Sequence, residues 1–434
     1  MTQLAEVHLW GKLVGAVAIT GSSAVARFEY SPDFVGRGLQ VSPLLMPLSS
    51  TVYQFPALNL DAFHGLPGLL ADSLPDRFGN TLIDAWLATQ GRAPGSFGSV
   101  ERLCYIGSRG MGALEFRPVK GPRSRKSEKL HFEALVALAS DVLKRRNDLA
   151  VSFAPGSVHA GLAEILRVGT SAGGARPKAL IAWNPDTEAV RSGQAEIPDG
   201  FSCWLLKFDG VSGAGDHQLK DPKGFTRVEY AYSLMARAAG ITMTECRLLE
   251  EGPRKHFMTL RFDRTVAHAR LHMQTLGALA HLDYNQPRAH SYEQAFQVMR
   301  QLGLTAVARE ELYRRCAFNL IARNQDDHVK NIAFLMDERG TWSLAPAYDL
   351  TYGHDPGNRW MAQHQMGVNG KFDGFAPEDL LQLADTAGLS RRTARDLIQE
   401  VGHAVRRWEE FAGIAHVPEG YVQQIKSNHR LELA

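Results

Sequence analysis

The stretch Asn324–Asn331 reads NQDDHVKN and stands just past the point where the sequence changes from β-rich to mostly helical. It places Asp326 five residues before Asn331 on a polar loop, and Asp349 follows after a strand-like run. A phosphoryl-transfer site needs a carboxylate for the acceptor hydroxyl, with an amide and a second carboxylate for Mg²⁺. Asp326 is therefore a candidate base, and Asn331 and Asp349 are candidate metal ligands.

The segments around this loop support that geometry. A helix is predicted over 307–323, and its end is a rigid mount for Asp326. Residues 332–335 and 342–344 read as a hairpin, which would return Asp349 beside Asn331. The alternative is a polar loop after a helix, in which Asp326 or Asp327 serves only as a cap.

Residues 169–178 read GTSAGGARPK and lie between two strand-like runs. Glycines and other small residues allow backbone N–H groups to approach phosphate oxygens. The Walker A pattern is absent, and a flexible loop without a ligand is the alternative.

Lys207 is the single charged residue of the apolar run Cys203–Phe208. A lysine inside a buried strand needs a partner or a ligand, and Glu229 on the following predicted helix could pair with it. The alternative is a lysine at a strand end that reaches solvent. Leu260–Arg264 then reads as a strand end, located where a two-lobed kinase has its hinge.

Length and composition set outer limits. The chain has 434 residues, a net charge of +2 and 44% hydrophobic residues, which is ordinary for a globular protein of two or three domains. No apolar run is long enough to span a bilayer, no secretory signal is evident, and the four cysteines form no Cys-x-x-Cys pair. These features predict a cytoplasmic protein without a membrane partner.

The periodicity predicts strands first and helices later. Strands are expected within 7–30, 107–118, 179–183, 203–208 and 256–263, a linker at 119–129, and helices at 69–90, 130–147, 226–239, 291–303, 307–323, 376–387, 390–412 and 418–430. This order predicts an α+β protein with two lobes and a cleft between them.

Taken together, the motifs resemble the HipA-like serine/threonine kinases, the toxin half of HipBA-type toxin–antitoxin modules. The resemblance covers nearly the whole chain. It is carried by Pro47-Leu48, Leu74-Pro75-Asp76, the Ser171–Lys178 loop, Arg261-Phe262-Asp263-Arg264, Asp326-x-His328-x-x-Asn331 and Pro346-x-Tyr348-Asp349.

The resemblance implies a two-lobed protein-kinase-like fold, with a β-rich N-terminal lobe and an all-helical C-terminal lobe. Residues 1–120 would form an N-terminal subdomain, 121–264 the kinase N-lobe with phosphate loop and hinge, and 265–434 the catalytic C-lobe.

The resemblance also implies roles for individual residues. Asp326 would be the catalytic base, Asn331 and Asp349 the Mg²⁺ ligands, and Glu229 the ion-pair partner of Lys207. Residues that would bind ATP are Gly173, Gly174, Ala175, Arg176, Pro177, Lys178, Lys207, Leu260, Arg261, Phe262, His328 and Tyr348. Ser171 would be autophosphorylated and would thereby shut the enzyme off, with Thr170 as the neighbouring alternative.

The loop departs from the family pattern, because it reads Ala-Arg-Pro-Lys where Ala-Gln-x-Lys is expected, and Pro177 removes one N–H donor. By resemblance, the partner is a small helix-turn-helix antitoxin (HipB-like) that carries the contact with operator DNA. The target would be a translation component such as an aminoacyl-tRNA synthetase. Two alternatives remain open: a small-molecule or lipid kinase of the same fold, and a non-catalytic co-repressor.

Overall fold

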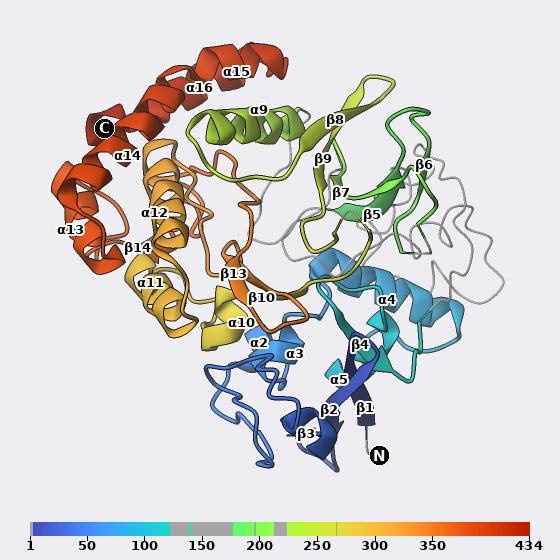
Figure 1. Ribbon diagram of the computed structural model, residues 1–434. Helices are drawn as coiled ribbons and strands as arrows, with labels where there is room; N and C mark the ends of the chain where they lie inside the picture. The colour runs from blue at the N-terminus through green and yellow to red at the C-terminus, as the bar shows by residue number, and fades with distance from the viewer. Residues whose placement is uncertain (1–2, 122–138, 140–176, 195–196, 212–223, 266) are drawn as a thin grey trace.

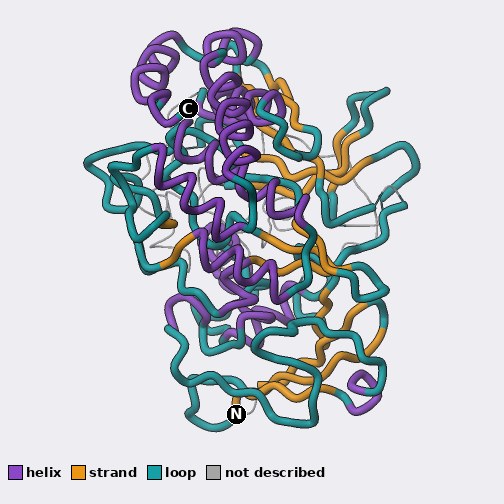
Figure 2. The backbone as a smooth tube through the Cα atoms, turned by 60° about the vertical axis from the view of Figure 1, so that its left-hand side comes forward, coloured by secondary structure: helices purple, strands orange, loops and turns teal. Residues whose placement is uncertain are grey.

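The structure is a computed structural model that describes residues 3–121, 139, 177–194, 197–211, 224–265 and 267–434. Figure 1 shows an N-terminal part in blue, a sheet in green beside it, and an array of helices that carries the C-terminus. In Figure 2 the helices gather in a column, with most of the strands along one side of it. The described part of the chain contains no helix that is both long and apolar enough to cross a membrane.

The N-terminal part is a four-stranded antiparallel sheet covered by short helices. The sheet has the order β3-β2-β1-β4. Its strands are β1 Gln3–Leu9, β2 Lys12–Ile19, β3 Arg27–Tyr30 and β4 Leu114–Arg117, and the helices are α1 Pro32–Val35, α2 Leu60–Phe63, α3 Gly68–Ala71, α4 Arg77–Thr89 and α5 Ser99–Ile106. Alternating residues such as Val7 and Val17 pack with Leu70 and Leu103 in one core, because successive side chains of a strand face opposite sides.

The single helix predicted over 69–90 is wrong, because the chain breaks it into α3 and α4. Pro75 lies between the two helices and cannot donate a backbone hydrogen bond. Asp76 then caps α4 by accepting a hydrogen bond from the Gly79 amide at 2.7 Å. The residues between the helices, 72–76, form a bend that becomes part of the site described below.

A five-stranded antiparallel sheet follows, with the order β6-β5-β7-β9-β8. Its elements are β5 Lys178–Trp183, β6 Val190–Ser192, β7 Ser202–Lys207, β8 Cys246–Glu251 and β9 Arg254–Leu260, with helix α9 Phe225–Ala238 packed on β8 and β9. Phe78 and Leu82 of α4 share a core with Ile181 and Trp204 of this sheet, so α4 joins the N-terminal part to it.

The remaining chain is mainly helical, but its described residues also form five strands. The three-stranded sheet has the order β10-β12-β13, with β10 His272–Thr275, β12 Ala333–Met336 and β13 Trp342–Leu344, and β11 His290–Ser291 pairs in parallel with β14 Met366–Gly367. The expectation of an all-helical 265–434 is therefore wrong. The hairpin expected from 332–335 and 342–344 is present, and β10 pairs with its buried strand β12.

The helices of this region surround the largest core. They are α10 Leu276–Ala280, α11 Tyr292–Gln301, α12 Ala306–Ile321, α13 Pro377–Ala387, α14 Arg391–Arg406, α15 Trp408–Ile414 and α16 Glu419–Asn428, followed by a 3₁₀ turn at Leu431–Leu433. Tyr313 and Phe318 of the buried α12 lie in this core with Trp408. The expected helix 390–412 is two helices, because the chain turns at Arg407, whose backbone lies between α14 and α15.

Candidate active site

The loop that follows α12 is folded tightly by its own backbone. The amide of His328 donates to the carbonyl of Asp326 at 3.0 Å, and the amide of Asn331 donates to the carbonyl of His328 at 2.8 Å. The side-chain nitrogen of Asn331 also donates to the Asp326 carbonyl, at 2.8 Å. Because the nitrogen of this amide is used here, its oxygen Oδ1 is left as an acceptor, which is the atom that a hard cation needs.

Asp327 anchors the loop from the buried side. Its carboxylate accepts hydrogen bonds from the hydroxyl of Tyr292 at 2.9 Å, from His364 Nδ1 at 2.9 Å and from the amide of Gln365 at 2.8 Å. The side chain of Asp327 is 1% exposed, whereas that of Asp326 is 36% exposed. One carboxylate of the adjacent pair therefore holds the loop in place, and the other stays accessible.

The hairpin β12–β13 brings Asp349 to the same place, as expected from sequence. Asp349 has a left-handed backbone, with φ of 53°, a conformation that costs energy in most residues and is often found at functional sites. Lys207 of β7 donates to Asp349, and its Nζ also lies 2.5 Å from Glu229 Oε1 of α9. Burial alone would raise the pKa of Asp349, but the ammonium groups of Lys207 and Lys178 lower it to about 2.

A cavity of 420 Å³ connects these groups. Asp326, His328, Asn331, Tyr348, Asp349 and Glu229 line it, with apolar side chains from the five-stranded sheet such as Leu205, Phe257 and Leu260. The part of the chain that the structure describes contains no cluster of three or more His, Cys, Asp or Glu side chains suited to a metal. The donor set of Asp349, Asn331 and nearby Asp326 matches instead the sparse oxygen ligands of Mg²⁺, which commonly shares its coordination with substrate phosphates.

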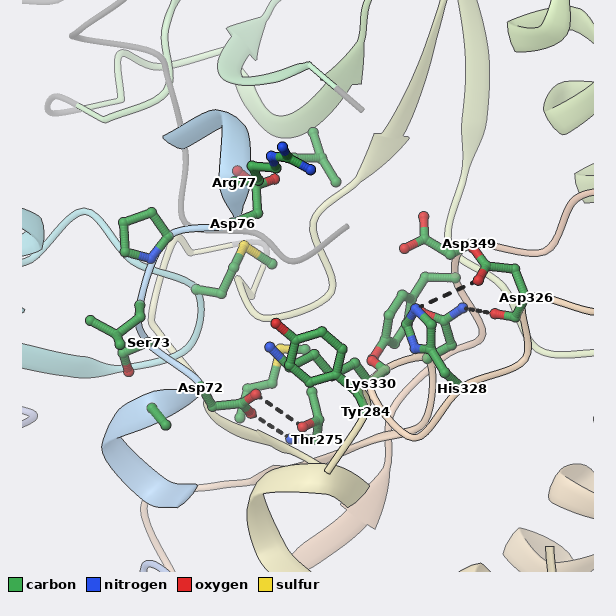
Figure 3. A pocket seen from close by; sticks show the side chains of 18 of the residues that line it. Asp72, Ser73, Asp76, Arg77, Thr275, Tyr284, Asp326, His328, Lys330 and Asp349 are labelled. Carbon is green, nitrogen blue, oxygen red and sulfur yellow. Dashed lines mark hydrogen bonds and ion pairs between the residues drawn. The ribbon is translucent and has the colours of Figure 1, made fainter. Parts of the chain in front are cut away.

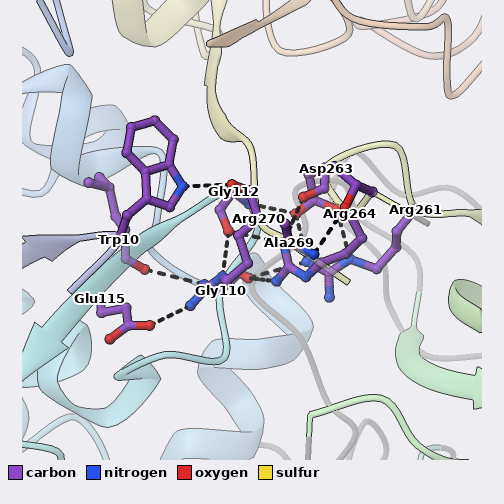
Figure 4. A network of polar contacts seen from close by, with 11 residues as sticks. Trp10, Gly110, Gly112, Glu115, Arg261, Asp263, Arg264, Ala269 and Arg270 are labelled. Atoms are coloured by element: carbon purple, nitrogen blue, oxygen red, sulfur yellow. Dashed lines mark hydrogen bonds and ion pairs between the residues drawn. The ribbon is translucent and has the colours of Figure 1, made fainter. Parts of the chain in front are cut away.

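The segment Leu260–Arg264, which is expected to form a hinge that binds ATP, is partly committed to contacts within the protein. The side chain of Arg261 is turned into a buried network, where it makes two hydrogen bonds to Asp263, at 2.9 and 2.7 Å. Asp263 also accepts from the Gly112 amide at 2.7 Å and from Arg264 at 2.8 Å, as Figure 4 shows. Arg261 borders the cavity but serves to join the hinge to the glycine-containing segment 110–112.

Backbone groups at the hinge differ in what they can offer a ligand. The Leu260 amide already donates to the Glu245 carbonyl at 2.8 Å, so it is not available to adenine. Within the described residues, the Phe262 amide has no hydrogen-bond partner, and the Phe262 ring lies 5.5 Å from that of Tyr348. The resemblance assigns both Leu260 and Phe262 to ATP, and of their two backbone amides only that of Phe262 is compatible with a contact to adenine within the described residues.

Lys178, at the start of β5, lies opposite Lys207 in the sheet. Its side chain is 2% exposed, and Nζ lies 3.6 Å from Asp76 Oδ2. Burial lowers the pKa of Lys178, with opposition from Asp76, and burial raises that of Asp76 to about 6. Several predicted residues of the loop lie outside the described residues, namely Thr170, Ser171, Gly173, Gly174, Ala175 and Arg176. The predicted helix 130–147 also lies outside them, apart from Ala139. Pro177 is described and directly precedes Lys178.

The N-terminal part contributes residues to the cavity that were not among the expected site residues. Asp72, Ser73, Asp76 and Arg77 line it from the bend between α3 and α4, and Thr275, Tyr284 and Lys330 face them (Figure 3). The bend is held by Asp72, which accepts from both the amide and the hydroxyl of Thr275, at 2.7 and 2.9 Å. The only available signal was the Leu74-Pro75-Asp76 sequence, which local periodicity could not connect to a loop some 250 residues away.

Comparisons with known proteins follow the same division of the chain. A model of the HipA N-terminal domain matches residues 5–117, and a model of the HipA-like C-terminal domain matches residues 170–408. The structure is similar to HipA from Shewanella oneidensis, solved in a toxin–antitoxin complex with HipB and operator DNA. The TM-score is 0.68 at 18% identity, over 99% of this chain and 96% of that one.

Two curated proteins are also similar in sequence. A Haemophilus influenzae protein named "Putative kinase" is 23% identical over 263 residues, which is 52% of this chain and 76% of that protein. A Sinorhizobium fredii protein named "Putative kinase Y4mE" is 30% identical over 182 residues, which is 37% of this chain and 41% of that protein.

The fold and cavity define a mixed α/β protein in which an ion-paired strand lysine and a loop carboxylate face one site. Because the C-terminal domain model covers more than half of the chain, the chain belongs to the HipA family.

Proposed function

We propose that this chain is an ATP- and Mg²⁺-dependent protein serine/threonine kinase that acts as the toxin of a HipBA-type module. The observation that carries the proposal is the position of Lys207, which contacts Glu229 and Asp349, two residues that line the cavity together with Asp326 and Asn331. A strand lysine paired with a helix glutamate, beside a metal-binding carboxylate, is the arrangement that positions nucleotide phosphates in kinases.

Each group has a role that its geometry supports. Leu205, Phe257 and Leu260 provide an apolar slot for adenine at the hinge side of the cavity. Asp349 and the Asn331 oxygen are the ligands for Mg²⁺, which neutralises the charge of the phosphate oxygens when it is bound. Lys207, which contacts Asp349 directly, would then hold a phosphate oxygen beside the same carboxylate.

Asp326 is the residue that accepts the proton of the acceptor hydroxyl. As the oxygen of that hydroxyl bonds to the γ-phosphorus of ATP, the bond to the β–γ bridging oxygen breaks, and ADP leaves with its electron pair. The partial exposure of the Asp326 carboxylate allows an acceptor side chain to reach it, whereas the buried Asp327 cannot be reached. The Nε2 atom of His328, on the same loop, lies 4.0 Å from the Asp326 carboxylate, and the ring lies beside Asp326 and Asp349 (Figure 3).

The biological context is proposed by analogy with the relative from Shewanella, which was solved with HipB and operator DNA. A helix-turn-helix antitoxin would bind this chain and carry the contact with DNA, and the target would be a translation component such as an aminoacyl-tRNA synthetase in the cytoplasm. Phosphorylation of Ser171 would inactivate the enzyme, because a dianionic side chain is repelled by the carboxylates of the site.

Incubation of the purified chain with γ-labelled ATP, Mg²⁺ and cell lysate tests the proposal. We expect a labelled protein band that the wild type produces and Asp326→Ala does not, with Asp396→Ala, whose side chain is exposed on α14, as the matched control. Label confined to the small-molecule fraction would contradict protein kinase activity. Calorimetry without any Mg²⁺-dependent ATP binding would instead identify a non-catalytic co-repressor.

A further inference from the structure

Lys330 lies on the same loop as the proposed base Asp326, four residues later, and its side chain lines the same cavity. The loop is fixed around it: the Lys330 carbonyl accepts the hydroxyl of Tyr348, and the carbonyl of Val329 accepts the amide of Gly277 in α10 at 3.1 Å. Its ammonium group lies over the ring of Tyr284, 4.0 Å from the ring centroid. The position of this cation is thus set by the same scaffold that sets Asp326.

This ammonium lacks an anionic partner among the residues that the structure describes, with 4.0 Å as the limit for an ion pair. The lysines at the nucleotide end differ, because Lys207 contacts Glu229 and Asp349, and Lys178 lies 3.6 Å from Asp76. Lys330 is half-buried, and an enclosed cation normally has a partner, so an ammonium group that lies over an aromatic ring in a cavity is well placed to bind an anionic ligand.

The carboxylates nearest to Lys330 are already bound to other donors. Asp72 accepts two hydrogen bonds from Thr275, and Asp76 accepts from the Gly79 amide and faces Lys178. Asp283 accepts from Asn59 at 2.8 Å and from Gln286 at 3.2 Å. The negative charges of these carboxylates stabilise the Lys330 ammonium in the cavity, although none of them forms an ion pair with it.

The cavity extends past Asp326 on the side of Lys330. There residues 72–77 form the far wall and Tyr284 lies across from them, so this chamber lies to one side of Asp326, His328 and Asp349 (Figure 3). A second cavity of 550 Å³ shares His64, Leu74 and Asn80 with the first and continues over the N-terminal part. The two adjoining cavities offer more room than a small acceptor needs, and this room suits a segment of polypeptide.

We propose that this chamber receives the acceptor segment of a protein substrate, and that Lys330 binds a non-bridging oxygen of the phosphoryl group as it moves to the acceptor hydroxyl. The inference rests on the proposed kinase function and adds a catalytic residue and an acceptor subsite to it. Lys330 acts on the acceptor side of the phosphorus, whereas Lys207 acts on the nucleotide side. No bond is made to Lys330, and its proton stays on the ammonium throughout.

The test compares ADP binding with and without aluminium fluoride, which occupies the place of the phosphoryl group in transfer. The proteins are wild type, Lys330→Met, Lys330→Arg and, as a matched control, Lys12→Met, whose lysine is exposed on β2. We expect the Kd for ADP–Mg²⁺ to agree within about twofold among the four proteins. The gain in ADP affinity on adding aluminium fluoride should fall at least about tenfold in Lys330→Met alone. Lys330→Arg, which keeps the charge, should retain most of it.

Turnover measurements on the labelled substrate band complete the test. Lys330→Met should lower kcat by about tenfold or more with little change in the KM for ATP. Equal fluoride tightening in Lys330→Met and wild type, or a loss confined to the KM for the acceptor, would overturn the role of Lys330 in transfer. Failure of the wild type to transfer phosphate or to bind ADP would instead contradict the kinase function itself.

Discussion

The carboxylates of Asp326 and Asp327 are adjacent in the chain, yet the first opens on the cavity and the second is enclosed by Tyr292, His364 and Gln365. The loop can therefore present the accessible carboxylate of Asp326 because the neighbouring Asp327 is fixed in the core. Stability and chemistry are assigned to successive residues.

This division predicts different outcomes for matched alanine variants. Asp327→Ala should lower the free energy of unfolding by about 3 kcal/mol, because it leaves three buried donors without their acceptor. Asp326→Ala should change it by less than about 1 kcal/mol while abolishing phosphate transfer. Urea denaturation followed by circular dichroism provides the comparison, and equal stabilities of the two variants would refute the assigned division.

The network at Asp263 predicts a large effect far from the transferred phosphate. Asp263→Ala should destabilise the fold by about 3 kcal/mol and weaken ATP binding, because Arg261 and Arg264 lose their buried counter-charge. Glu250→Ala is the control and should leave stability almost unchanged, since its pair with Lys255 lies at the surface, with 67% of the Glu250 side chain exposed. Chemical denaturation and calorimetry measure the two effects, and a neutral Asp263→Ala would argue against this link.

Asp76 predicts a pH dependence of stability. Burial raises the pKa of its carboxyl to about 6, above the ordinary value of 3.8, so the folded chain binds more protons than the unfolded chain between these pH values. The contribution of Asp76 is therefore fully present below pH 4 and is lost as the pH rises through 6. The wild type should lose on the order of 2 kcal/mol relative to Asp76→Asn between pH 4 and 7, as measured by thermal or urea unfolding. A difference in stability between wild type and Asp76→Asn that does not vary with pH would show that the pKa of the Asp76 carboxyl is not raised.

The resemblance also predicts a switch at Ser171. Ser171→Ala should keep transferring phosphate to substrate after prolonged incubation with ATP, whereas the wild type should slow as it phosphorylates itself. Time courses of both proteins, with phosphopeptide mapping of the wild type, provide the measurement. Label on Thr170 or on another residue would move the site, and identical time courses would remove the switch.

Local patterns predicted the parts of the site that lie close together in sequence. The spacing of Asp326 and Asn331, and the hairpin before Asp349, were readable because a loop and a hairpin are closed by neighbouring residues. The pairing of Lys207 with Glu229 was expected from a charge inside an apolar strand, and the two groups lie 2.5 Å apart.

Features set by distant contacts could not be read in this way. The break at Pro75 looked like part of one amphipathic helix, because apolar spacing continues on both sides of it. The side chain of Arg261 was assigned to ATP, but its direction is decided by Asp263 and by the carbonyl of Gly110, 151 residues earlier. The wall of the cavity at Asp72 depends on Thr275, which no local periodicity connects to it.

The close contact between α3 and α10 has a consequence for how this architecture can be divided. Gly68 lies so near the α10 backbone that a Cβ atom there would approach the Ala278 carbonyl oxygen to 2.2 Å, and its amide donates to His281 at 3.0 Å. The segments matched by the two family models therefore pack against each other as one structural unit. A fragment that begins after residue 117 would lose the cavity wall at 72–77 and also α4, whose Phe78 and Leu82 pack against the five-stranded sheet, so both ends of the cavity would be damaged together.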